Sequence, residues 1–142
     1  MRTTPLLQLE DGRRLVAASQ ALSAAHGAAV TIALTDPGGH LLLLERRDGA
    51  SAASSEAAIA KARMAALNGK PTAEQEAAIN GARPALLQLA GVFGAPAVAM
   101  AGGVPLLLGS DCLGAIGVSG STPDLDAAIA SAGVAALAGL GA

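Results

Sequence analysis

The chain has 142 residues, a formal net charge of −2 and 52% hydrophobic residues, and its aromatic content is a single Phe. Such a length favours one domain with a core of aliphatic side chains. The weakly negative charge, and the lack of a Lys/Arg cluster interleaved with aromatic residues, argue against a nucleic-acid partner. No apolar stretch reaches the roughly 18 to 20 residues of a membrane-spanning helix, and the start of the chain lacks the pattern of a signal peptide. We therefore expect a cytoplasmic protein without a membrane role.

The first part of the chain predicts a helix followed by a hairpin. Apolar residues recur at helical spacing over residues 9–26, and residues 29–34 alternate as in a strand. A turn of Asp, Pro, Gly and Gly at residues 36–39 leads into a returning strand at residues 40–47. Its four leucines, Leu41–Leu44, place apolar side chains on both faces. Helices can cover one face, and the other needs a ligand or another subunit, of which we favour the subunit.

The rest of the chain predicts further helices and three more strands. A helix is expected from about Ser55 to Asn68, and a short one begins at Pro71 and Thr72. Residues 97–101, 104–108 and 113–118 are predicted as short strands, before a last helix from Pro123 to about residue 140. This order predicts an α+β fold, with helices packed on one antiparallel sheet of five strands, in a single domain over residues 1–142.

The strongest local pattern is the glycine-rich strand Gly114–Gly120, which breaks at Ser119 and Gly120 and runs into a helix start at Thr122 and Pro123. The Thr oxygen can accept a hydrogen bond from an unpaired N–H of the first turn, and Pro fits the first helical position. A strand, a glycine turn and a helix N-terminus together direct N–H groups and a partial positive charge at one point. We therefore expect an anion to bind at this turn.

Short motifs in chain order carry a resemblance to a known family. They are Ala33–Leu41, Arg46–Ala50, Ile59–Ala62, Pro71–Thr72, Gly102–Pro105, Gly114–Gly120 and Asp126. Together they resemble the GlcG/HbpS-like family of heme-binding and heme-degrading domains, which includes the C-terminal domain of PduO-type corrinoid adenosyltransferases. The resemblance implies a profilin-like α+β fold, assembly into dimers and often octamers, and a ligand site lined by the hairpin, the helix of Lys61 and the glycine strand.

The resemblance also implies heme or iron binding, a corrinoid-linked role, or a place in small organic-acid catabolism. The predicted ligand-binding residues are Arg46, Asp48, Lys61, Gly102, Gly103, Ser119 and Gly120. Arg46 would offer a planar fork and Lys61 a point charge to one carboxylate, of a heme propionate or of a small organic acid. The alternative is that Arg46 and Asp48 pair at the hairpin end and that Lys61 is a solvated helix side chain.

Three functions remain open from the sequence. The leading one is a protein that binds heme or a small anionic ligand, and it works as a homo-oligomer of two to eight subunits. Heme pockets commonly gain from aromatic walls, and for such a wall this chain offers Phe93, Met64, Met100 and many Leu. The second is an enzyme of organic-acid catabolism in which Lys61, together with Asp126 or His40, moves protons on a bound carboxylate. The third is an accessory subunit without chemistry of its own.

Two other chemistries receive less support from the sequence. Ser119 with Asp126 and either His26 or His40 has the residue types of a catalytic triad, but residue 121 is Ser where the nucleophile-elbow motif has Gly. His40 follows a turn near the expected ligand site, so it is either a contact to a ligand or metal or an edge-strand residue. The sequence does not indicate a set of metal ligands.

Overall fold

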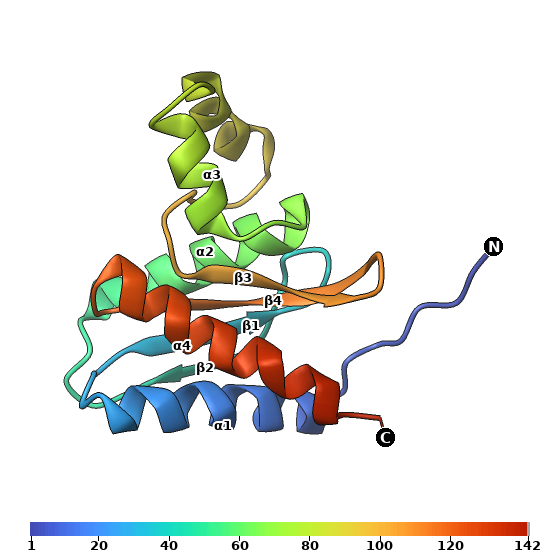
Figure 1. The fold of residues 1–142 in the computed structure, drawn as a ribbon, viewed down its shortest axis with the longest axis vertical. Coiled ribbons are helices and arrows are strands. Elements are labelled where there is room, and N and C mark those ends of the chain that lie inside the picture. The colour runs from blue at the N-terminus through green and yellow to red at the C-terminus, as the bar shows by residue number, and fades with distance from the viewer. Residues whose placement is uncertain (142) are drawn as a thin grey trace.

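The computed structural model describes residues 1–141 and consists of one antiparallel sheet with helices on both faces (Figure 1). Ala142, the last residue of the predicted domain, lies outside the described residues. The strands are β1 (Thr31–Thr35), β2 (Leu41–Arg46), β3 (Gly103–Leu108) and β4 (Asp111–Ser119). The helical segments are α1 (Leu9–Ala25), α2 (Ala52–Asn68), α3 (Thr72–Ile79), η1 (Pro84–Val92), α4 (Pro123–Ala135) and η2 (Ala136–Gly139).

The α+β class with helices packed on an antiparallel sheet is confirmed, but the prediction of five strands is wrong. Within residues 1–141 the sheet has four strands in the order β2-β1-β4-β3. Residues 97–101 are not a strand, because their polar groups bond to helices: the Val98 N–H donates to the Ala60 carbonyl on α2 (3.3 Å). The Ala101 N–H donates to the Glu76 carboxylate on α3 (3.3 Å). The profilin-like arrangement stays a prediction.

The two faces of the sheet differ in the size of their side chains. One face packs against α1 and α4, and its core contains large aliphatic residues: Leu15, Ile32, Leu34, Ile116, Val118 and Ile129. The other face packs against α2, and the buried members of its apolar cluster are alanines, with Leu44 and Ile59 partly buried against them: Ala33, Ala58, Ala62, Ala65, Ala66 and Ala115. A methyl group added to Gly117 of β4 would lie 2.6 Å from the Ala62 nitrogen. The small residues therefore bring α2 very close to the sheet.

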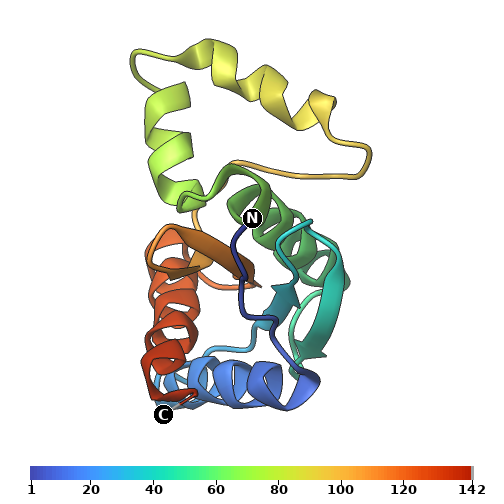
Figure 2. The ribbon, with the colours of Figure 1, turned by 90° about the vertical axis from the view of Figure 1, so that its right-hand side faces the viewer.

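Helix α2 starts earlier than the sequence predicted, at Ala52, because Ser51 caps it: the Ser54 N–H donates to the Ser51 hydroxyl (3.2 Å). Beyond α2, the segment made of α3, η1 and the chain returning to β3 stands away from the sheet, as Figure 2 shows. None of the helices within residues 1–141 has the length and apolar character needed to cross a bilayer.

Candidate functional site

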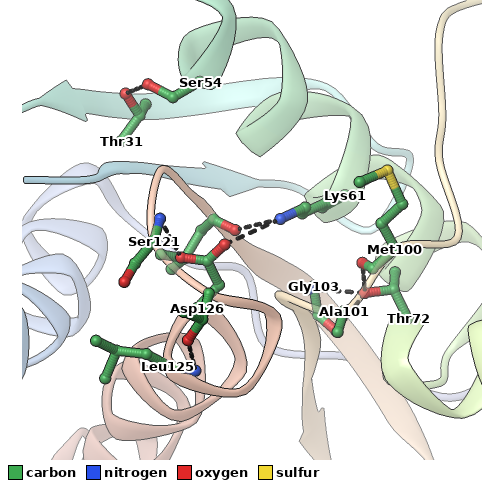
Figure 3. A network of polar contacts seen from close by, with 12 residues as sticks. Thr31, Ser54, Lys61, Thr72, Met100, Ala101, Gly103, Ser121, Leu125 and Asp126 are labelled. Atoms are coloured by element: carbon green, nitrogen blue, oxygen red, sulfur yellow. Dashed lines mark hydrogen bonds and ion pairs between the residues drawn. The ribbon is translucent and has the colours of Figure 1, made fainter. Parts of the chain in front are cut away.

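Lys61 is a buried residue of α2, and it does not lie on the solvated face of the helix. It is 3% exposed, and its Nζ donates to the Val118 carbonyl of β4 (2.9 Å) and to Oδ2 of Asp126 on α4 (3.4 Å). Figure 3 shows the ammonium directed at both oxygens. The residue therefore joins α2, the sheet and α4 across the interior.

Asp126 completes this pair from the first turn of α4. It is also 3% exposed, and its Oδ1 accepts from the Ser121 N–H (3.0 Å). Burial raises the pKa of the Asp126 carboxyl above its usual 3.8, and Lys61 together with the backbone N–H groups of Ser121 and Gly120 offsets only part of that rise. Asp126 is thus a carboxylate of the chain itself at the point where we expected a ligand carboxylate.

The N-terminus of α4 is already supplied with acceptors and negative charge. The Thr122 hydroxyl accepts from the Leu125 N–H (3.3 Å), as the sequence predicted, and Asp124 and Asp126 both lie in the first turn. Two carboxylates repel a further anion, so this helix end offers less to an anionic ligand than its sequence suggested.

The glycines predicted as ligand contacts instead pack around the pair. A methyl group on Gly102 would lie 3.0 Å from Lys61 Nζ and 2.5 Å from the Val118 oxygen, and the φ of Gly102 is +129°. One on Gly103 would lie 2.8 Å from the Thr72 methyl, and the Gly103 N–H donates to the Thr72 hydroxyl (2.8 Å). Both glycines are buried. They allow the chain before β3 to pass directly over Lys61.

The remaining two predicted residues of the glycine turn lie at its solvent side. Ser119 is half-buried and Gly120 is exposed. A methyl group on Gly120 would lie 2.9 Å from the Ala29 oxygen, so the turn packs closely on the chain that leads into β1. The structure thus brings Ser119 and Gly120 near the buried pair but leaves them at the surface.

Arg46 and Asp48 lie in a different part of the molecule. They line an open groove of about 850 Å³ between α1 and β2, and Lys61 is not among its lining residues. Within residues 1–141, Arg46 and Asp48 form no ion pair with each other. The predicted convergence of Arg46 and Lys61 on one ligand is therefore not the arrangement seen in this chain, since the Lys61 ammonium is held by Val118 and Asp126.

His40 lines a separate cavity of about 460 Å³ at the turn between β1 and β2. The cavity is lined by Gly38, His40, Arg63, Leu67, Phe93, Gly94 and Ala95. The His40 side chain is 81% exposed, and its Nδ1 lies 3.3 Å from the Asp36 carboxylate. Val118, which holds Lys61, pairs with Ile32, four residues before Asp36. At a rise of about 3.3 Å per strand residue, these four residues place the His40 cavity roughly 13 Å from the Lys61–Asp126 pair.

Sequence reasoning missed Arg63, Phe93 and Leu67 as lining residues of one site. Arg63 and Leu67 are four residues apart on α2, so helical spacing places them on one face. The Arg63 Nε donates to the Gly39 carbonyl (3.2 Å), and Nη1 donates to the Pro96 carbonyl. The spacing could have linked Arg63 to Leu67, but nothing local in the sequence links either to Phe93. Across residues 1–141, no three His, Cys, Asp or Glu side chains gather in a way that could hold a metal ion.

The fold and the buried Lys–Asp pair define a class of α+β domain in which a lysine-bearing helix packs on the glycine-rich strands of an antiparallel sheet. The chain belongs to the HbpS-like family, described as "Haem degrading protein HbpS-like", which matches residues 7–135. The resemblance seen in the sequence motifs is thereby confirmed.

Individual relatives agree with this assignment. Protein GlcG of Escherichia coli strain K12 is 35% identical over 120 residues, which cover 84% of this chain and 85% of GlcG. A crystal structure of a double mutant of HbpS from Streptomyces reticuli is similar with a TM-score of 0.85 at 29% identity, covering 96% of this chain and 90% of that one. A crystal structure of a PduOC–heme complex has a TM-score of 0.82 at 25% identity, covering 93% and 95%.

Proposed function

We propose that this protein binds heme or a small anionic ligand in the manner of the GlcG/HbpS-like family. The observation that carries the proposal is the cavity beside the β1–β2 turn, where an exposed imidazole, a guanidinium and the ring of the single Phe of the chain line one space. Its volume of about 460 Å³ falls within the roughly 300–1,000 Å³ of small-molecule sites. The heme complex of PduOC, a structural relative, supports heme as the first ligand to test.

The residues of this cavity suit the three chemical parts of a heme. Heme, when bound, supplies a redox-active iron that takes an axial ligand from the protein. His40 offers an imidazole nitrogen, while Phe93 and Leu67 offer apolar surface. Arg63 uses Nε and Nη1 for backbone carbonyls, and a guanidinium has five N–H donors, so it retains donors for a carboxylate. The same guanidinium would suit a smaller organic acid.

The alternative of acid–base catalysis by Lys61, Asp126 and His40 receives less support. Lys61 and Asp126 are buried against each other, whereas His40 is mostly exposed at the other end of β1. A catalytic group has to reach the proton that it moves, so a structural role suits the buried pair better. We further propose that the protein acts in the cytoplasm as a homo-oligomer, and a role in organic-acid metabolism stays an open proposal.

A hemin titration tests the proposed function. We expect wild-type protein to give a saturable shift of the heme absorbance band, and Arg63→Gln to raise the Kd about tenfold, equal to ~1.4 kcal/mol. Arg14→Gln is the matched control, because Arg14 is exposed on α1 and does not line this cavity. The urea unfolding midpoint of each variant shows whether the fold is intact.

Two outcomes of the titration would contradict heme binding or the choice of site. Without any saturable band shift in the wild type, heme binding is wrong, and calorimetry with lactate then tests the anion alone. If Arg14→Gln and Arg63→Gln weaken hemin binding equally, the ligand does not sit in this cavity.

A further inference from the structure

We propose that Nε2 of His40 is the protein atom that ligates heme iron in this cavity, and that Asp36 positions the imidazole for it; this inference rests on the proposed function. The turn between β1 and β2 holds the imidazole through contacts with Asp36.

The turn is built so that one carboxylate fixes both the backbone and the ring. The Asp36 N–H donates to the His40 carbonyl (2.9 Å), and the Gly39 N–H donates to the Asp36 carbonyl (3.0 Å). Asp36 Oδ1 accepts from the His40 backbone N–H (2.9 Å). Both carboxylate oxygens of Asp36 also lie 3.3 Å from His40 Nδ1. The position of the ring therefore follows from a turn that is closed by several hydrogen bonds.

This contact determines which ring nitrogen is free. A proton on Nδ1 is stabilised by the Asp36 carboxylate, and in the neutral ring this leaves the lone pair on Nε2. Within residues 1–141, Nε2 of His40 has no hydrogen-bond partner, and the side chain is 81% exposed. Histidines that ligate metals almost always donate their other N–H to a carboxylate or carbonyl. Asp36 and His40 reproduce that arrangement without a metal.

Two glycines of the turn leave room for the imidazole and for Arg63. A methyl group on Gly38 would lie 3.0 Å from both His40 Cε1 and Nδ1, and one on Gly39 would lie 2.7 Å from Arg63 Cγ. Side chains at these two positions would therefore press on the imidazole and on the arginine. With glycines there, Arg63 and the ring share one cavity with Phe93. His40, as the iron ligand, and Arg63, as the cation for a propionate, would thus lie in the same cavity.

The test compares hemin complexes of four proteins by absorbance and electron paramagnetic resonance. They are the wild type, His40→Ala, Asp36→Asn and His26→Ala, the last being a matched control because His26 is the other histidine and lies exposed at the end of α1. We expect His40→Ala to lose the spectral signature of imidazole-ligated iron and to bind hemin at least about tenfold more weakly. Added free imidazole should restore that signature. His26→Ala should match the wild type.

Asp36→Asn tests the positioning role separately. We expect the iron to keep its imidazole ligand, the Kd for hemin to rise about tenfold, and the reduction potential of the iron to rise, because the ring loses a carboxylate that increases its basicity. Asp36→Glu should recover part of both changes. A purely structural role of Asp36 in the turn would lower the urea midpoint and leave the potential of the remaining complex unchanged.

Different results would overturn the inference and the proposed function. If His40→Ala keeps the wild-type spectrum and affinity, the iron ligand lies elsewhere, and the inference is wrong while heme binding stands. If wild-type protein gives no saturable hemin complex, both are wrong. Because the His40 side chain is exposed, we expect its replacement by Ala to leave the urea midpoint within experimental error, so loss of the spectral signature would report on ligation.

Discussion

The role of Lys61 is determined by partners that are distant in the chain. Lysines on helices are mostly solvated, yet Lys61 is buried against Asp126, 65 positions later in the chain. Its ammonium also donates to the Val118 carbonyl, and Asp126 also accepts from the Ser121 N–H. Removing one member of a buried ion pair leaves the other charge without compensation, which usually costs about 3–5 kcal/mol. The pair therefore joins three elements and is unsuited to replacement one residue at a time.

The burial of Asp126 predicts a pH dependence of stability. Burial raises the pKa of its carboxyl in the folded protein above the usual 3.8, so folding favours the protonated form. The stability contributed by Asp126 is therefore complete below the unfolded pKa and is lost as the pH rises through the folded pKa. We expect the free energy of unfolding of the wild type, relative to Asp126→Asn, to fall over this interval and then level off.

Urea unfolding of the wild type and of Asp126→Asn from about pH 3 to pH 8 measures the difference between their free energies of unfolding. Because the two proteins share all other carboxylates, the titration of those groups cancels in the difference. A difference that increases with pH would contradict the prediction. It would mean that the Lys61 ammonium outweighs burial and holds the pKa of Asp126 below its usual value.

The contact between α2 and β4 carries the element-scale prediction. Gly117 faces α2 so closely that a methyl group would lie 2.6 Å from the Ala62 nitrogen and even nearer the Ala58 carbonyl. Gly117→Ala should therefore force α2 off the sheet and lower the free energy of unfolding by about 3 kcal/mol or more. Gly91→Ala is the matched control, since nothing lies within 4 Å of a methyl group there. Equal urea midpoints for the two variants would contradict this packing argument.

The sequence predicted elements well where the local pattern also decides the packing. The first helix, the hairpin and the Thr122 cap of α4 were predicted within a few residues, because their periodicity, turn residues and cap are local signals. Residues 97–101 were assigned to a strand because apolar alternation does not distinguish a neighbouring strand from a neighbouring helix, and here Val98 bonds to α2.

The candidate site was harder to predict than the fold. Lys61 was predicted as a ligand contact or proton-moving group and Asp126 as a proton-moving group, because a sequence does not show that two distant charges neutralise each other. Arg63 and Phe93 are 30 positions apart and line one cavity only because the chain after η1 folds back past α2. Which residues line this cavity therefore depends on the tertiary structure, and no local sequence pattern indicates it.

At the scale of the whole molecule, the two edges of the sheet are unequal. β3 forms one edge and contains Pro105, which has no N–H to offer another strand. β2 forms the other edge, and its Leu41 and Leu42 are 45% and 41% exposed. An exposed edge with apolar side chains is a surface on which another chain can add, so β2 is the better candidate for contact between subunits.

This asymmetry sharpens the prediction that the protein is an oligomer. Static light scattering at micromolar concentration should give at least the mass of a dimer, and Leu42→Lys should shift the population toward the monomer because a charged edge residue opposes strand addition. Leu87→Lys is the matched control: Leu87 is 69% exposed on η1, remote in the chain from β2, and its replacement should leave the mass unchanged. A wild type that elutes as a clean monomer would contradict oligomerisation. If Leu87→Lys alone releases monomers, the subunits meet through the η1 segment, and the exposed leucines of β2 then need another explanation.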